Sequence, residues 1–209
     1  MSAALLVAGC MTGPPVPSRV PGHPTATTEA EAWRSLQQRP LHLPTLAPGT
    51  PCPTSQGHQV HPAFGPVLGD GPVYAGFFGG SHSDYVHGVV GYADAQSFGD
   101  GTSDWGGVKV LWVIKPPYRG PVLIRGGQLD GSSPMRFNGG LDEPSDDPLA
   151  LLSELRLTGA IDYDKPWPGW TTYTRLQAPG CYAYQVDGLT FSYPIIFKAI
   201  AEHSPPPKP

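Results

Sequence analysis

The chain has 209 residues, enough for one domain of ordinary size with a tail. Gly and Pro number 27 each and leave room for few long helices, whereas a hydrophobic content of 39% allows a buried core. Charged residues make up only 14%, the net charge is -4, and no basic patch indicates nucleic-acid binding. The composition predicts a loop-rich, mostly β protein.

The chain begins MSAALLVAGC, and the apolar run from Ala3 to Gly9 is too short to span a bilayer. The residues from Val7 to Cys10 resemble a lipobox, in which small residues admit the signal peptidase and the cysteine takes a diacylglycerol. We therefore expect residues 1–9 to be a truncated lipoprotein signal peptide and Cys10 to be the lipidation site. A charged n-region is missing, so we expect the start codon to lie upstream. The alternative is a short apolar leader that happens to end in cysteine.

The next segment, residues 10–50, is dense in proline and lacks hydrophobic periodicity. Proline fixes an extended backbone and removes hydrogen-bond donors, so such a segment acts as a semi-rigid spacer. The sequence predicts a Pro-rich linker that holds a folded domain away from a membrane.

One stretch of this linker, TTEAEAWRSLQQR, favours a short helix. Either Thr27 or Thr28 can serve as the N-cap, and Glu31 lies three residues after Thr28, as a capping box requires. Two interpretations remain open. The helix either docks Trp33 and Leu36 on the domain or forms only transiently in the linker.

Two cysteines, Cys52 and Cys181, remain once Cys10 carries a lipid. Two thiols in an exported chain most simply form a disulfide, and a metal pair is disfavoured because two isolated cysteines supply half a zinc site. In GCYAYQVDG the apolar face of the strand holds the two tyrosines and the valine, whereas Cys181 points to the other side. We expect the bridge to lie off the main core.

Turn signals separate short apolar runs in the body of the chain, which predicts a β-sandwich domain over residues 51–203 and a disordered tail over 204–209. The segment DPLALLSELRL fits either a helical turn or an edge strand, and the Gly-rich residues 58–107 mix strands with long loops. The predicted strands cover residues 108–115, 120–126, 132–139 and 169–180, followed by a hairpin within 176–199 that turns at Asp187-Gly188.

The stretch YTRLQAPGCYAYQVDGLTFSYPIIFKA resembles the last two strands of an immunoglobulin-like domain, where Pro-Gly leads into an aromatic strand and a tight turn returns a hydrophobic one. Together with WVIKPPYRGPVLIRGGQLDG it is similar to the C-terminal part of bacterial cell-envelope lipoproteins of uncharacterised activity. The resemblance covers fewer than half of the residues. It implies an immunoglobulin-like β-sandwich and an envelope location, and it implies no substrate.

Two groups of side chains could hold a metal ion. Imidazole and carboxylate ligands in the Gly-rich half would suit zinc, with polar loop histidines as the favoured alternative. The members of this group are His58, His61, His82, Asp84 and His87. Turn-like acids could bind calcium, with solvated loop acids favoured. These acids are Asp130, Asp142, Glu143, Asp146 and Asp147.

Four large aromatic residues lie close together in DYDKPWPGWTTYTRL, namely Tyr163, Trp167, Trp170 and Tyr173. They either cap the end of the core or stand out as a platform for a flat ligand such as a sugar ring. Capping is favoured because tryptophan is highly buried on average.

Two functional hypotheses follow. The first is a lipid-anchored extracytoplasmic protein of the bacterial envelope that has a structural or ligand-binding role, with a glycan or an envelope protein as partner and no cofactor. The second is a metal-dependent enzyme that uses the histidines of residues 58–87. The sequence carries no G-x-S-x-G elbow, Ser/Lys pair or H-E-x-x-H motif, so the first is favoured.

Overall fold

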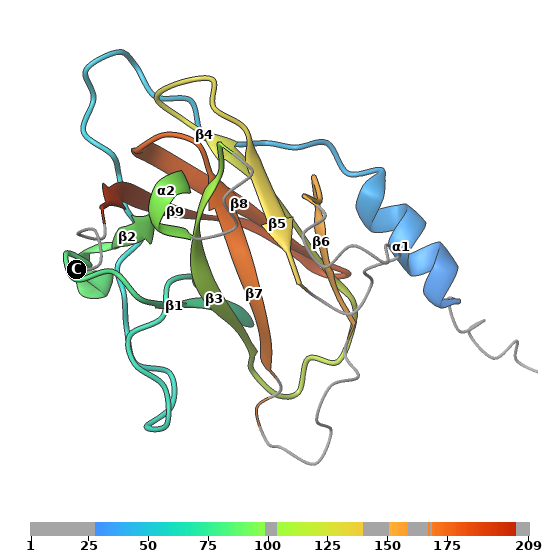
Figure 1. The fold of residues 1–209 in the computed structure, drawn as a ribbon. Helices are drawn as coiled ribbons and strands as arrows, with labels where there is room; N and C mark the ends of the chain where they lie inside the picture. Colours follow the sequence, from blue (N-terminus) through green and yellow to red (C-terminus); the bar gives the residue numbers. More distant parts are fainter. Residues whose placement is uncertain (1–27, 99–103, 140–150, 159–166, 168, 204–209) are drawn as a thin grey trace, which may run out of the picture.

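The computed structural model describes residues 28–98, 104–139, 151–158, 167 and 169–203. Strands predominate, so the predicted mostly β class is confirmed (Figure 1). No helix in these ranges is long and apolar enough to cross a bilayer. The elements are α1 (Glu29–Gln37), β1 (Val73–Phe78), the 3-10 helix η1 (Tyr85–His87), β2 (Val89–Ala93), α2 (Ala95–Phe98), β3 (Gly106–Ile114), β4 (Val122–Gln128), β5 (Met135–Asn138), β6 (Leu155–Leu157), β7 (Gly169–Leu176), β8 (Gly180–Gly188) and β9 (Phe191–Glu202).

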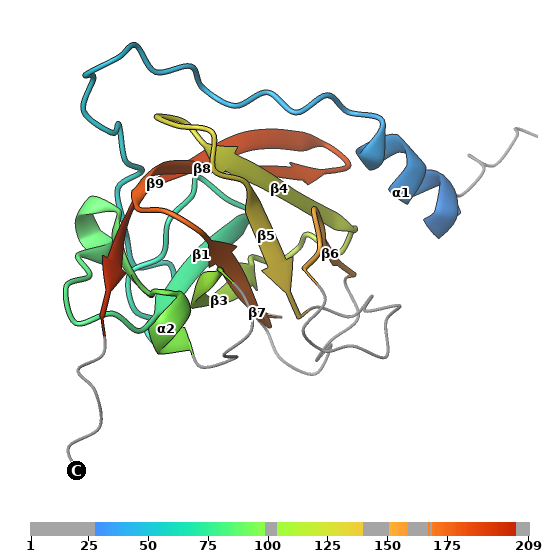
Figure 2. The ribbon, with the colours of Figure 1, turned by 45° about the horizontal axis from the view of Figure 1, so that its top comes forward.

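The strands form one continuous sheet in the order β5-β7-β3-β2-β9-β8-β4-β6, and β1 pairs with β3. All pairings are antiparallel except that of β2 with β9. The sheet curls around its core in a barrel-like way, so the layers of the expected sandwich belong to a single sheet (Figure 2). The core is aromatic at its centre, where Tyr184 contacts both Trp112 and Phe197.

The predicted strands after residue 107 are present, with ends that shift by a few residues. The segment that fitted either a helical turn or an edge strand forms the short strand β6, which lies at one end of the strand order beside β4. In the Gly-rich half, β1 and β2 alternate with loops, as the sequence indicates.

The predicted turn of the β8–β9 hairpin is wrong by two residues. Gly188 pairs with Phe191, so Leu189 and Thr190 form the two-residue turn. Asp187 lies inside the strand, and its side chain is fully buried. Its carboxylate accepts a 2.8 Å hydrogen bond from Arg125 and lies 3.8 Å from the Arg39 guanidinium. These long-range partners outweigh the local preference of Asp-Gly for a turn.

Helix α1 docks on the sheet, which decides between the two interpretations of this segment. Thr28 and Glu31 form the predicted capping box. The buried side chains of Trp33 and Leu36 pack against Leu123 of β4. Packing against the domain therefore extends upstream of residue 51.

The chain that follows α1 crosses the outside of β4 and β8 as an extended strap, residues 39–55 (Figure 2). At its start, Arg39 donates to the backbone carbonyls of Gly188 and Phe191. Further along, Gln185 of β8 donates to the Pro40 carbonyl and accepts from the backbone N–H of His42. Residues 39–42 of the predicted linker are thus held on the sheet by specific polar contacts.

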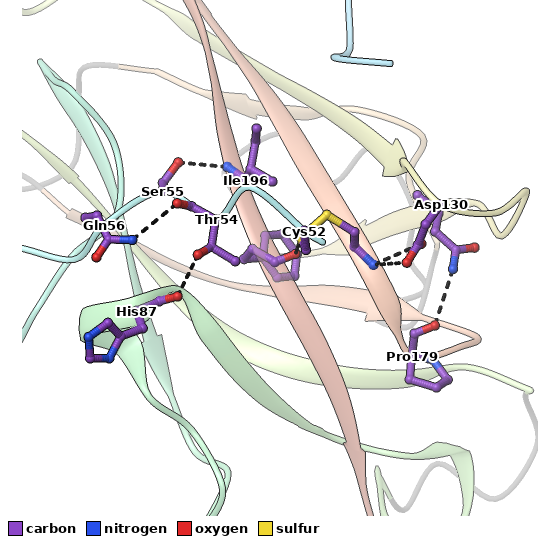
Figure 3. Close-up of a disulfide and its surroundings, with 11 residues drawn as sticks. Cys52, Thr54, Ser55, Gln56, His87, Asp130, Pro179 and Ile196 are labelled. Carbon is purple, nitrogen blue, oxygen red and sulfur yellow. Dashed lines mark hydrogen bonds between the residues drawn. A yellow bond between two sulfur atoms is a disulfide. The ribbon is translucent and has the colours of Figure 1, made fainter. Parts of the chain in front are cut away.

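A disulfide between Cys52 and Cys181 fastens the far end of the strap, as predicted (Figure 3). The two Cα atoms lie 5.4 Å apart, and the Cys181 N–H donates to the Asp130 carboxylate. Beyond the bridge, Thr54 donates to the His87 carbonyl and the Ser55 hydroxyl accepts from Ile196 N–H. Cys181 points away from the main core, which confirms the expected face.

Candidate ligand-binding face

The outer side of β1, β3 and β7 carries a row of three exposed side chains. Phe78 pairs with Lys109, and Lys109 pairs with Tyr173, so their side chains lie next to one another on adjacent strands. The neighbouring residues in each strand point into the core, which forces these three outward. Phe78 is 51% exposed and Tyr173 is 38% exposed. We call this row, together with Phe98 beside it, the open face.

A hollow of about 210 Å³ lies beside the row. Phe78, Phe98 and Tyr173 supply its aromatic wall, and Lys109 supplies a positive charge. The remaining lining is of small residues and β3 backbone, namely Gly79, Gly80, Gly91, Ala93, Ser97, Gly107 and Val108. Lys109 and Tyr173 are the ionisable side chains among these lining residues. The hollow thus combines flat apolar rings with one cation and the hydroxyl group of Tyr173.

Because Gly107 has no side chain, the Phe98 ring can pack directly against the backbone of β3. A Cβ atom at this position would come within 2.6 Å of the Phe98 ring. The ring is fixed from one side by the Arg175 guanidinium, 4.1 Å from its centroid, and it meets Tyr173 edge to face at 5.5 Å. Helix α2 therefore delivers a preorganised ring to the open face.

The loop after β1 closes the opposite side of the hollow. Gly80 adopts a φ of +81°, and a Cβ atom there would lie 2.8 Å from the Gly91 Cα of β2, so only glycine fits this close approach. The Glu202 carboxylate accepts hydrogen bonds from the backbone N–H groups of Ser81 and His82, at 2.9 and 2.8 Å. Burial raises the pKa of Glu202, but these two N–H groups and the His82 ring outweigh it, so the net pKa is lowered. An ionised Glu202 holds the loop in place.

A second hollow, of about 510 Å³, adjoins the first on the other side of Phe78. It is mainly apolar and is lined in part by Phe64, Gly76, Tyr85 and Leu111. Phe78 lines both hollows, so the two meet at this residue. The open face therefore continues as an apolar surface along β1 and β3.

The structure separates the three aromatic residues of the predicted group that it describes. Trp170 is 2% exposed and belongs to the main core, in line with the favoured capping interpretation. Trp167 is half-buried against Phe64 and His61. Tyr173 follows Trp170 by three residues in β7, and side chains an odd number of residues apart in a strand point to opposite faces. Tyr173 therefore lies on the open face. Tyr163 lies outside the described residues. The predicted platform is therefore not formed by these residues together.

The metal candidates of the Gly-rich half are dispersed. His87 Nδ1 lies 2.6 Å from the Asp84 carboxylate, and this hydrogen bond lowers the pKa of Asp84, against a lesser effect of burial that raises it. His82 lies 3.3 Å from Glu202. His58 packs against Tyr74, and His61 packs against Trp167. Within the described ranges, no three His, Cys, Asp or Glu side chains form a group that could hold a metal ion.

Of the other predicted site residues, the structure describes Asp130 but not Cys10 or the remaining acids. Asp130 is a structural acceptor for the Cys181 N–H. Cys10 and the other calcium candidates, Asp142, Glu143, Asp146 and Asp147, lie outside the described residues.

Comparison of the chain with protein-family models, curated proteins and solved structures finds no match. The resemblance to bacterial lipoproteins and to an immunoglobulin-like domain stays a prediction. The functional argument therefore rests on the geometry of the open face.

Sequence reasoning missed Phe78, Phe98 and Lys109. One signal was available for Phe78. The stretch VYAGFFGG ends a strand with two consecutive phenylalanines, and because adjacent strand residues point to opposite faces, one of the two rings must point outward. The order Val108-Lys109-Val110 likewise indicates that the lysine points outward from the predicted strand, whereas Phe98 carries no comparable local signal, since its neighbours come from distant parts of the chain.

Proposed function

We propose that this protein is a lipid-anchored, extracytoplasmic domain of the bacterial envelope that binds carbohydrate on the open face. The observation that carries the proposal is the row of Phe78, Lys109 and Tyr173 beside a preorganised hollow. Exposed aromatic rings next to polar groups on a rigid sheet are typical of binding sites.

A sugar ring has an apolar C–H face and a rim of hydroxyl groups. The rings of Phe78 and Tyr173 offer flat surfaces for the C–H face. The Tyr173 hydroxyl and the ammonium group of Lys109 offer hydrogen-bond partners for the rim. The open face thus matches both sides of a sugar. A wholly apolar ligand would leave the polar groups without partners.

Two features support the location. The Cys52–Cys181 disulfide is typical of an oxidising compartment. The residues up to Cys10 resemble a lipobox, and lipidation there would place the domain outside the cytoplasmic membrane. The anchor is tested by palmitate labelling of the protein in a bacterial host. Labelling must be lost in Cys10→Ala, and a variant that still takes up label would contradict the anchor.

Binding is tested by affinity electrophoresis of the exported protein through gels that contain neutral and acidic polysaccharides. We expect retardation in at least one gel and its loss in the double variant Phe78→Ala/Tyr173→Ala. Leu189→Ala is the matched control, because Leu189 is 42% exposed but lies in the β8–β9 turn. Migration of the parent unchanged by every polysaccharide, or equal retardation of the double variant, would refute the proposal.

A further inference from the structure

We infer that the carbohydrate is acidic and that a ring carboxylate of the ligand binds the ammonium group of Lys109. The inference rests on the proposed function and names the ligand class of the same face. It makes Lys109 the residue that determines specificity, whereas Phe78 and Tyr173 supply stacking that any sugar can use.

Lys109 lies between two aromatic residues on the open face. It is exposed at the centre of the row, with neutral aromatic residues directly opposite it on both neighbouring strands. Adjacent strands lie about 4.8 Å apart, so the lysine stem rises between two rings. A sugar stacked on either ring therefore has its edge, where ring substituents project, within reach of the ammonium group.

The charge of Lys109 is not balanced by an ion pair within the described residues. In the part of the chain that the structure describes, no Asp or Glu forms an ion pair with Lys109. The two acidic residues near the hollow, Glu202 and Asp94, already have partners within the protein. Glu202 holds the loop N–H groups, and Asp94 accepts from Ser97 and contacts His203. The anion that complements Lys109 is thus best supplied by the ligand.

The arginines near the strap differ from Lys109 in having a carboxylate partner within the protein. Arg39 and Arg125 both contact the buried carboxylate of Asp187, so their charge serves the fold. Lys109 lies on an open surface among rings, where a single point charge can select an anion without a fixed bidentate geometry. A uronic acid offers what this arrangement recognises, namely one carboxylate at the edge of a ring with an apolar face.

The experiment compares each acidic oligosaccharide with its own methyl ester, which keeps the sugar rings and removes the charge. Oligosaccharides from alginate, polygalacturonate and hyaluronan are titrated calorimetrically into the disulfide-bonded protein. For at least one of the three, we expect the free acid to bind about five-fold more tightly than the ester, the upper end for an exposed ion pair. The difference should shrink as salt is raised from about 0.05 to 0.5 M, because screening weakens exposed ion pairs.

Two variants assign the effect to one residue. Lys109→Met keeps the aliphatic stem, and it should bind acid and ester equally. Lys198→Met is the matched control, since Lys198 is also an exposed strand lysine but lies on β9, next to Cys181. It should keep the preference for the acid.

The outcomes separate the two proposals. Equal binding of acid and ester by the parent, with loss in Phe78→Ala/Tyr173→Ala, would overturn the acidic class and leave carbohydrate binding intact. Failure of every acidic and neutral sugar to bind would overturn both. A preference for the acid that survives Lys109→Met would overturn the role of Lys109, and equal, Lys109-dependent binding of polyglutamate would show that charge alone is recognised.

Discussion

The outer surface of the sheet differs between its two halves. Over β4 and β8, the strap covers the strands and is fixed by the disulfide, by Gln185 and by the buried Asp187. Over β1, β3 and β7, the rings of Phe78 and Tyr173 stay exposed. The covered half contains the polar groups that hold the chain to itself. The open half leaves rings and a cation without such a cover, and this difference is the main reason to place ligand binding there.

The largest expected effect on stability comes from strand β7, which contributes Trp170 to the core and Tyr173 to the open face. Trp170→Ala should lower the free energy of unfolding by about 3–5 kcal/mol, because it empties a packed site in the core. Tyr173→Ala should change it by less than about 0.5 kcal/mol, since the side chain points outward. Urea unfolding followed by circular dichroism measures both. If Trp170→Ala does not fold, Trp170→Phe provides a milder test. Equal losses for the two residues would contradict the assignment of faces.

Asp187→Asn should lower the stability by about 3 kcal/mol, as expected when one partner of a buried ion pair is removed and its cations remain. The loss should leave carbohydrate binding unchanged at temperatures where the variant is folded. Combining it with Arg125→Met, which removes one of the stranded charges, should recover part of the loss. A wild-type unfolding midpoint for Asp187→Asn would show that the carboxylate does not hold the strap.

Cys181→Ser should lower the stability by about 2 kcal/mol or more, because the bridge joins residues 129 positions apart and restricts the unfolded chain. Mass spectrometry of a non-reduced digest should show the Cys52 and Cys181 peptides linked. Free thiols at both positions in periplasmic material, or no change in melting temperature, would argue against a structural disulfide.

The smallest effect concerns Glu202, which supports the loop of the open face. Its pKa is lowered in the fold, so its contribution to stability is present above its ordinary pKa of about 4.3 and is lost as the pH falls through the lowered value. Glu202→Gln should therefore be less stable than the parent at pH 7, and the difference should shrink as the pH falls below about 4. Thermal melts between these pH values measure the difference. A difference that persists unchanged at pH 3 would mean that the charge is not responsible.

Much of the fold follows from local patterns that the sequence displays. Apolar runs with turn signals gave the strands after residue 107, and alternation placed Cys181 away from the core. The predicted hairpin turn is wrong because Asp187 forms ion pairs with arginines about 60 and 150 residues away in the chain. These contacts outweigh the turn preference of the Asp-Gly pair. Local preference cannot reveal such partners.

The site was predicted less well for the same physical reason. Alternation along GWTTYTRL could have separated Trp170 from Tyr173, but the aromatic residues were grouped by their distance in sequence. The row itself depends on the register of β1 against β3 and of β3 against β7. These registers join residues up to about 70 positions apart, and composition does not encode them. The sequence predicts an aromatic platform for a flat ligand as the less favoured alternative, and of the four residues it groups, Tyr173 lies on the open face.

The claim that the open half of the sheet is the binding surface can be tested by mapping a bound oligosaccharide with NMR chemical shifts. A retarding oligosaccharide titrated into isotope-labelled protein should shift the resonances of Phe78, Lys109, Tyr173 and the loop at Gly80, while the signals of Gln185 and Leu189 on the covered half stay in place. Shifts confined to the strap and the β8–β9 hairpin, with the open face unaffected, would contradict the account.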